Sequence, residues 1–91
     1  MTYTYKNETY DLTKVTRLYP AATIEVPGGD SAQVSLEWAD LKHDKITIAY
    51  FVLVFDFDPV GELPVNRKEL QCETKEELLA VMQEVNVYFS K

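Results

Sequence analysis

The chain has few of the residues on which metal and redox sites are built. Among its 91 residues it contains one cysteine, Cys72, and one histidine, His43. A single cysteine excludes a disulfide within the chain and a metal site made of cysteines alone. We therefore predict no cofactor and a reducing compartment.

Long apolar runs are also missing. The longest apolar stretch, from Ala49 to Phe55, is far shorter than the roughly 20 residues that a membrane-spanning helix needs. Residues 1–5 lack the basic and then apolar pattern of a signal peptide. We expect a cytoplasmic protein that does not bind a membrane.

Basic residues are scarce as well. Nine lysines and arginines face fifteen acidic residues, the formal net charge is −6, and the acids are spread over both halves of the chain. Nucleic acids and anionic membranes are bound by clustered basic side chains. This charge balance disfavours both as partners.

The chain does have enough apolar residues for a core. Its composition is 46% hydrophobic and 12% aromatic, which is typical of a folded domain. A chain of this length forms one domain, residues 1–91, and buries about 60–65% of the surface that it exposes when unfolded.

The first half is rich in strand patterns. Residues 2–6 and 9–12 predict a hairpin with its turn at Asn7-Glu8. A third β-rich segment at 15–19 stops at Pro20, and residues 23–26 continue or restart it. The sequence at 27–30, Pro-Gly-Gly-Asp, predicts a turn. Val34, Leu36 and Trp38 then alternate with polar residues, which predicts a strand with one buried face, followed by a polar turn over 40–44.

Residues 46–57 form the longest β-rich run and predict the central strand. Its even positions, from Ile46 to Val54, and its odd positions, from Ala49 to Phe55, are both apolar, so both faces of this strand require cover. Residues 65–73 are ambiguous. Asn66 and Glu69 have capping-box spacing and favour a helix, whereas alternating Leu70 and Cys72 favour a short edge strand; we prefer the strand.

Thr74 begins the clearest helix signal. Thr74 and Glu77 match a capping box, in which the Thr74 hydroxyl accepts from the Glu77 amide while the Glu77 carboxylate reaches back to the Thr74 amide. An apolar stripe follows at helical spacing, formed by Leu78, Val81, Met82, Val85, Tyr88 and Phe89. Residues 85–90 also alternate, so this end is either helix or strand. The predicted fold class is α+β: an antiparallel, meander-like sheet of about five strands, with one C-terminal amphipathic helix packed on one face.

No candidate catalytic or metal site is complete. Asp56, Asp58 and Glu62 begin like a calcium loop, but Val60 and Arg67 occupy positions where oxygen ligands belong, so we expect a solvated acidic turn. We expect His43 to be a surface residue of a turn and Cys72 to be a small buried residue. Carboxylates in a solvated turn have no reason for the shifted pKa values that acid–base catalysis needs, so we predict that the protein is not an enzyme.

The two-faced central strand is the strongest functional indication. One helix covers one face of the sheet, so either the sheet curls around the strand or a second subunit covers the other face. We predict a small non-enzymatic binding or assembly module that self-associates as a homodimer through the second sheet face or an edge strand. The alternative is a small-ligand-binding domain with a pocket between a curled sheet and the C-terminal helix. The residues predicted to form the interface or the pocket are Trp38, Tyr50, Phe51, Leu53 and Phe55.

Overall fold

The structure is a computed structural model that describes residues 1–59, 61–63 and 65–89. In this part of the chain, six strands form two antiparallel sheets and are joined by two α-helices and one 3₁₀ turn. The elements are β1 (Thr2–Tyr5), β2 (Glu8–Asp11), η1 (Leu12–Lys14), β3 (Arg17–Glu25), β4 (Ser31–Ser35), α1 (Leu36–Leu41), β5 (Thr47–Asp56), β6 (Arg67–Cys72) and α2 (Lys75–Phe89).

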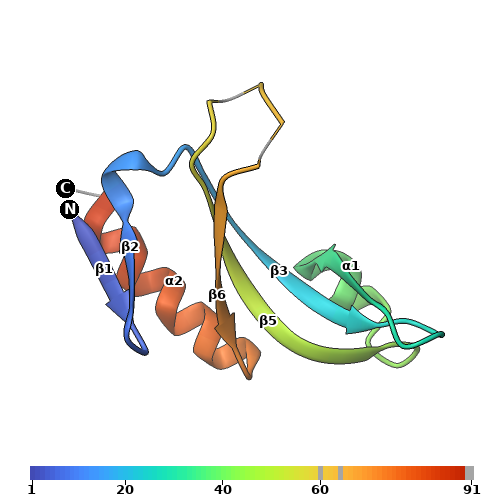
Figure 1. Cartoon of the computed structure of the whole chain (residues 1–91). Helices are drawn as coiled ribbons and strands as arrows, with labels where there is room; N and C mark the ends of the chain where they lie inside the picture. Colours follow the sequence, from blue (N-terminus) through green and yellow to red (C-terminus); the bar gives the residue numbers. More distant parts are fainter. Residues whose placement is uncertain (60, 64, 90–91) are drawn as a thin grey trace.

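The main sheet has the strand order β4-β3-β5-β6, and β1 and β2 form a separate hairpin. Strands β3 and β5 make a long curved ribbon, with α2 and the hairpin near one end and α1 and β4 near the other (Figure 1). The α+β class and the C-terminal helix on the sheet are confirmed. The order departs from a meander at one point, because β5 pairs with β3 and not with its predecessor β4.

The strand predicted through Trp38 ends at Ser35, and the prediction is wrong beyond that point. There the chain turns into α1, whose first residue is Leu36. The Ser35 hydroxyl accepts a hydrogen bond from the Trp38 amide at 3.1 Å and so caps the helix. A local side-chain cap therefore prevails over the alternating apolar pattern.

Pro20 does not interrupt β3, which runs unbroken from residue 17 to residue 25. Strand β4 pairs only with Ala21–Glu25, so Pro20 lies immediately outside this pairing. A proline is tolerated there, since an open edge needs no ladder hydrogen bond from its missing N–H. Among the described residues, the segment 17–20 has a strand neighbour on the β5 side only.

The N-terminal hairpin turns at Lys6-Asn7, one residue earlier than predicted. Both residues have positive φ angles, +49° and +69°, as the type I′ form of a two-residue hairpin turn requires. The hairpin is held to α2 by its tyrosines. The Tyr3 hydroxyl donates to the Glu84 carboxylate at 2.6 Å, and the Tyr5 hydroxyl donates to the Glu77 carboxylate.

The ambiguous segment after the β5–β6 connection is the strand β6, as preferred. Thr74 caps α2: its hydroxyl accepts from the Glu77 amide at 3.1 Å. The reciprocal bond differs from the prediction, because the Glu77 carboxylate accepts from the amide of Glu73, at 2.9 Å, and not from that of Thr74. Helix α2 continues to Phe89, so the strand alternative for 85–90 is wrong as far as residue 89, and residue 90 lies outside the described residues.

The core lies between α2, the hairpin and one face of the main sheet. Leu78, Val81 and Val85 of the predicted stripe are buried there, whereas Phe89 is 42% exposed. The other buried residues of this cluster are Tyr3, Tyr10, Leu12, Leu53, Phe55, Leu70 and Cys72.

Candidate functional site

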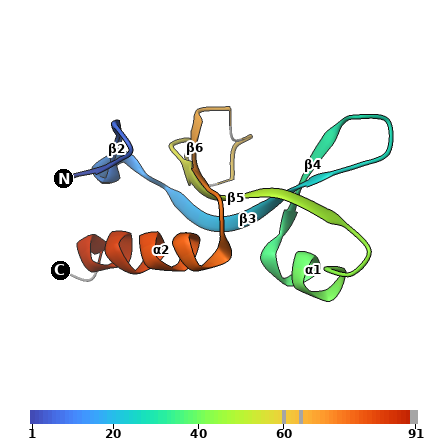
Figure 2. The same ribbon diagram turned by 90° about the horizontal axis from the view of Figure 1, so that it is seen from below.

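The odd and even positions of β5 have different surroundings. Leu53 and Phe55 are both fully buried in the core beneath α2 and the hairpin, and Phe51 packs against the same cluster. The ring of Phe55 stacks on that of Tyr10, with centroids 4.6 Å apart. Figure 2 shows that both helices lie on the same side of the β3–β5 ribbon, which leaves the opposite sheet face without a helix.

The helix-free face is covered by side chains of the sheet itself. Val52 and Val54 lie on it, yet they are only 1% and 0% exposed. The Gln33 amide on β4 donates to the Glu69 carboxylate on β6 at 2.6 Å, and this bond passes over the two strands between them. Val52 and Val54, two of the five apolar even positions of the predicted strand, are therefore buried within one chain, and Tyr19 and Tyr50 pack against them.

Asp56 is buried on the same face, and the prediction that it lies in a solvated turn is wrong. It is 1% exposed and stands directly opposite Arg17 on β3 and Arg67 on β6. The Nε atoms of Arg67 and Arg17 lie 3.5 and 3.9 Å from its two carboxylate oxygens. Arg17 precedes Asp56 by 39 residues and Arg67 follows it by 11 on the next strand, so the register of the sheet decides this burial.

The other acidic candidates stabilise or flank the β5–β6 connection. Asp58 accepts hydrogen bonds from the backbone amide and the side-chain amide of Asn66, at 2.7 and 3.0 Å, and the backbone bond is the main reason that its pKa lies below the ordinary value. Glu62 is exposed. Within residues 1–59, 61–63 and 65–89, no three histidine, cysteine or acidic side chains gather closely enough to hold a metal ion.

His43 and Cys72 have the surroundings that the sequence predicted. His43 is exposed, and its ring nitrogen Nδ1 lies 2.8 Å from the backbone oxygen of Asp40. Cys72 is fully buried, and burial is the main cause that raises the pKa of its thiol to about 11. The thiol is therefore protonated at neutral pH and is a poor nucleophile.

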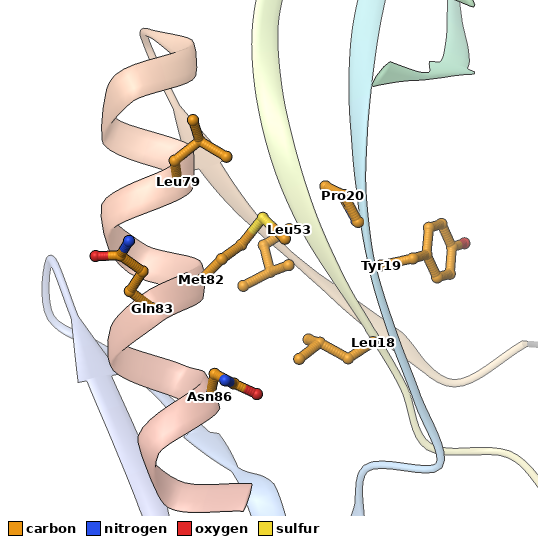
Figure 3. A pocket seen from close by; sticks show the side chains of 8 residues that line it. All are labelled: Leu18, Tyr19, Pro20, Leu53, Leu79, Met82, Gln83 and Asn86. Carbon is orange, nitrogen blue, oxygen red and sulfur yellow. The ribbon is translucent and has the colours of Figure 1, made fainter. Parts of the chain in front are cut away.

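A hollow of about 360 Å³ lies between α2 and the β3–β5 ribbon. Leu18, Pro20 and Leu53 line it from the sheet, and Leu79 and Met82 line it from the helix, with Gln83, Asn86 and Tyr19 completing the lining. In Figure 3, the side chains of Leu53 and Met82 point toward each other, whereas that of Tyr19 points away from the helix. None of the eight lining residues is charged, although 26% of the residues in the chain are charged.

A second hollow of about 370 Å³ continues the first along α2. The two hollows share Leu18 and Asn86, and the second is completed by Val15, Thr16, Arg17 and Phe89. We call the two together the α2–β3 groove. One wall is helix α2, and the other is the segment 17–20, whose backbone has no strand neighbour on this side among the described residues.

The predicted interface or pocket residues do not gather at one place. Leu53 and Phe55 belong to the core and Phe51 packs against it, and of these three only Leu53 also lines the α2–β3 groove. Tyr50 is half-buried on the helix-free face, and Trp38 is 40% exposed on α1.

Sequence reasoning missed most of the groove residues. Leu79 was the available signal, because it is an apolar residue outside the stripe that buries α2, and it is 45% exposed. Apolar residues outside the buried stripe of a helix remain open to a partner.

Neither described helix has the length and apolar character needed to cross a membrane. No family model matches the chain, and comparison with curated proteins and with solved structures found no match.

Proposed function

We propose that the protein is a non-enzymatic binding module that takes up an extended segment of a partner protein in the α2–β3 groove. The observation that supports this proposal most directly is the open edge of β3 beside an apolar hollow. Residues 17–20 pair with β5 on one side and have no described strand on the other. An extended segment added there would form main-chain hydrogen bonds, apart from a donor at Pro20, which has no N–H, and would place alternate side chains in the hollow.

The composition of the groove favours a protein segment over a polar metabolite. Its lining is mostly apolar, with Thr16, Gln83 and Asn86 as uncharged polar members and its charged member, Arg17, at one end. The exposed side chains of Leu79 and Phe89 border it and would be buried by an occupant. Such apolar surface beside an unpaired strand edge is typical of sites of strand addition.

Self-association stays a prediction, with an edge strand preferred over the second sheet face. The helix-free face no longer requires a second subunit, because Val52 and Val54 are covered within the chain. An edge strand remains the route that the structure favours. The segment in the groove would come either from a different protein or from a second copy of this chain. Sedimentation of the purified chain over a concentration series distinguishes the two, because only self-association makes its molecular mass depend on concentration.

A small apolar ligand is the second candidate. The first hollow, at about 360 Å³, falls in the range of about 300–1,000 Å³ that is common for ligand sites. It also lies between the sheet and the C-terminal helix, where the sequence alternative placed a pocket. A thermal-shift screen against apolar metabolites tests this candidate, and an unchanged midpoint throughout the screen would count against it.

The proposed function is tested with a displayed library of unstructured peptides and two variants of α2. Leu79→Lys places a charge in the groove, whereas Val87→Lys places the same charge on an exposed apolar site outside the groove lining. We expect the wild-type chain to enrich apolar extended sequences, and Leu79→Lys to weaken their binding at least about tenfold, because a buried unpaired charge costs more than 1.4 kcal/mol. Val87→Lys should bind as the wild type does. If no sequence is enriched, or if both variants bind equally well, the proposal is wrong.

A further inference from the structure

The open edge of β3 ends a row of alternating charges. Arg67 on β6, Asp56 on β5 and Arg17 on β3 stand directly opposite one another in the register of the sheet. Side chains that are directly opposite share a face and lie about 4.5–5.5 Å apart at their Cβ atoms. A strand added beside β3 would therefore place one residue next to Arg17, on the same face.

Arg17 has unused capacity for a carboxylate. Its side chain is 56% exposed, and its Nε lies 3.9 Å from the Asp56 carboxylate, which is beyond hydrogen-bond distance. The guanidinium lies over the Tyr19 ring, 5.7 Å from the centroid, and it makes no hydrogen bond with the described residues. A guanidinium carries five N–H donors and binds carboxylates in a two-pronged geometry.

The next positions along the edge require apolar partners. Leu18 and Pro20 project from the other face of β3, toward α2, and line the groove together with Leu79 and Met82. Residues opposite Leu18 and Pro20 would enter this uncharged lining. The residue opposite Tyr19 falls on the helix-free face, beside the half-buried Tyr19 ring, where the groove lining sets no requirement on its side chain.

We infer that the partner segment runs antiparallel to Arg17–Pro20 and has the pattern apolar, any residue, apolar, acidic, with the acidic residue beside Arg17. This inference rests on the proposed function and specifies its partner. Strand β5 already meets the other edge of the same segment in this way. Its residues Leu53, Val54, Phe55 and Asp56 face Pro20, Tyr19, Leu18 and Arg17 in an antiparallel register. The side chains of β3 alternate between the two faces of the sheet, and a strand on either edge lies beside the same side chains. A strand on the second edge would therefore meet the same alternation of apolar and charged neighbours that β5 meets.

The test uses capped six-residue peptides that differ at one position. The probe is Thr-Leu-Thr-Val-Glu-Thr, and its matched controls carry Gln or Lys in place of Glu. A fourth peptide has the reversed order, Thr-Glu-Val-Thr-Leu-Thr. Binding to the wild-type chain is followed by amide chemical shifts at low salt. We expect the Glu peptide to bind about three- to fivefold more tightly than the Gln peptide, the Lys peptide to bind most weakly, and the preference to shrink at high salt.

Variants of the chain then locate the charge preference. Arg17→Gln should bring the ratio of Glu-peptide to Gln-peptide affinity close to one. Lys14→Gln is the matched control, because it removes one positive charge from an exposed residue of η1 outside the groove. Lys14→Gln should keep the wild-type ratio, which separates a contact at Arg17 from the general repulsion of acidic peptides by an acidic protein.

The outcomes separate this inference from the proposed function. Equal affinities for the Glu and Gln peptides, with shift changes that still map to residues 17–20 and α2, overturn the acidic position and leave the proposed function standing. Tighter binding of the reversed peptide overturns the antiparallel orientation. If the peptide library also shows no binding that depends on Leu79, the proposed function fails, and the inference fails with it.

Discussion

Replacing Tyr5 by phenylalanine tests how the N-terminal hairpin is held on α2. The Tyr5 hydroxyl donates to the carboxylate of Glu77, which lies 72 residues away in the sequence. Glu77 also accepts from the Glu73 amide at 2.9 Å and forms an ion pair with Lys6 at 3.1 Å. The bond from Tyr5 is the main cause that lowers the pKa of Glu77 to about 2, and the same bond raises the pKa of Tyr5 to about 12.

The expected loss of stability is about 1.5 kcal/mol at pH 7. Hydrogen bonds to charged groups contribute about 1.5–3 kcal/mol. The lower end applies here, because the Glu77 side chain is 23% exposed and keeps its two other partners. For a domain of this size, such a loss lowers the melting temperature by about 6–12 °C. The measurement is urea unfolding of the wild type and of Tyr5→Phe at constant salt.

The difference between the two proteins should depend on pH. The folded pKa of Glu77 lies below its unfolded value of 4.5, so its contribution is present above pH 4.5 and is lost as the pH falls toward about 2. The folded pKa of Tyr5 lies above its unfolded value of 10, so its contribution is present below pH 10 and is lost as the pH rises through about 12. The stability difference should therefore be largest between about pH 5 and 9 and shrink on either side.

Tyr10→Phe is the matched control, because it removes a hydroxyl from the same hairpin that makes no hydrogen bond with the described residues. We expect Tyr10→Phe to unfold close to the wild-type midpoint. The difference in stability between this variant and the wild type should be the same at pH 5 and at pH 3. A Tyr5→Phe difference that is the same at pH 3 and pH 7, or that is absent at pH 7, would refute the reasoning.

Two further predictions concern the start of α2 and the buried thiol. Thr74→Ala removes the hydroxyl that accepts from the Glu77 amide and should cost about 1 kcal/mol in urea unfolding, whereas Thr74→Ser should cost less; equal losses would show that the cap is not the cause. Cys72 should react with a thiol reagent at pH 8 on the order of 100-fold more slowly in the native chain than in urea, because its pKa is raised from 9 to about 11 and it is fully buried. Equal rates in the two states would contradict its burial.

Local patterns in the sequence determined several elements of the fold. The Thr74 cap and the apolar stripe after it predict α2, because a helix start and its buried face depend on residues within a few turns of one another. The apolar character of both faces of β5 predicts a central strand, and β5 lies between β3 and β6. Local patterns gave the wrong element after Ser35. There the alternating segment forms α1, whose start is capped by one hydrogen bond to the Ser35 hydroxyl.

Tertiary structure alone decided the candidate site. The α2–β3 groove exists because β4 pairs with β3 only from Ala21 onward, which leaves residues 17–20 with an open edge beside α2. The cover on Val52 and Val54, and the burial of Asp56 between two arginines, depend on which residues stand opposite one another across four strands. Strand register brings together residues that are distant in the sequence, so no local pattern of side chains contains it.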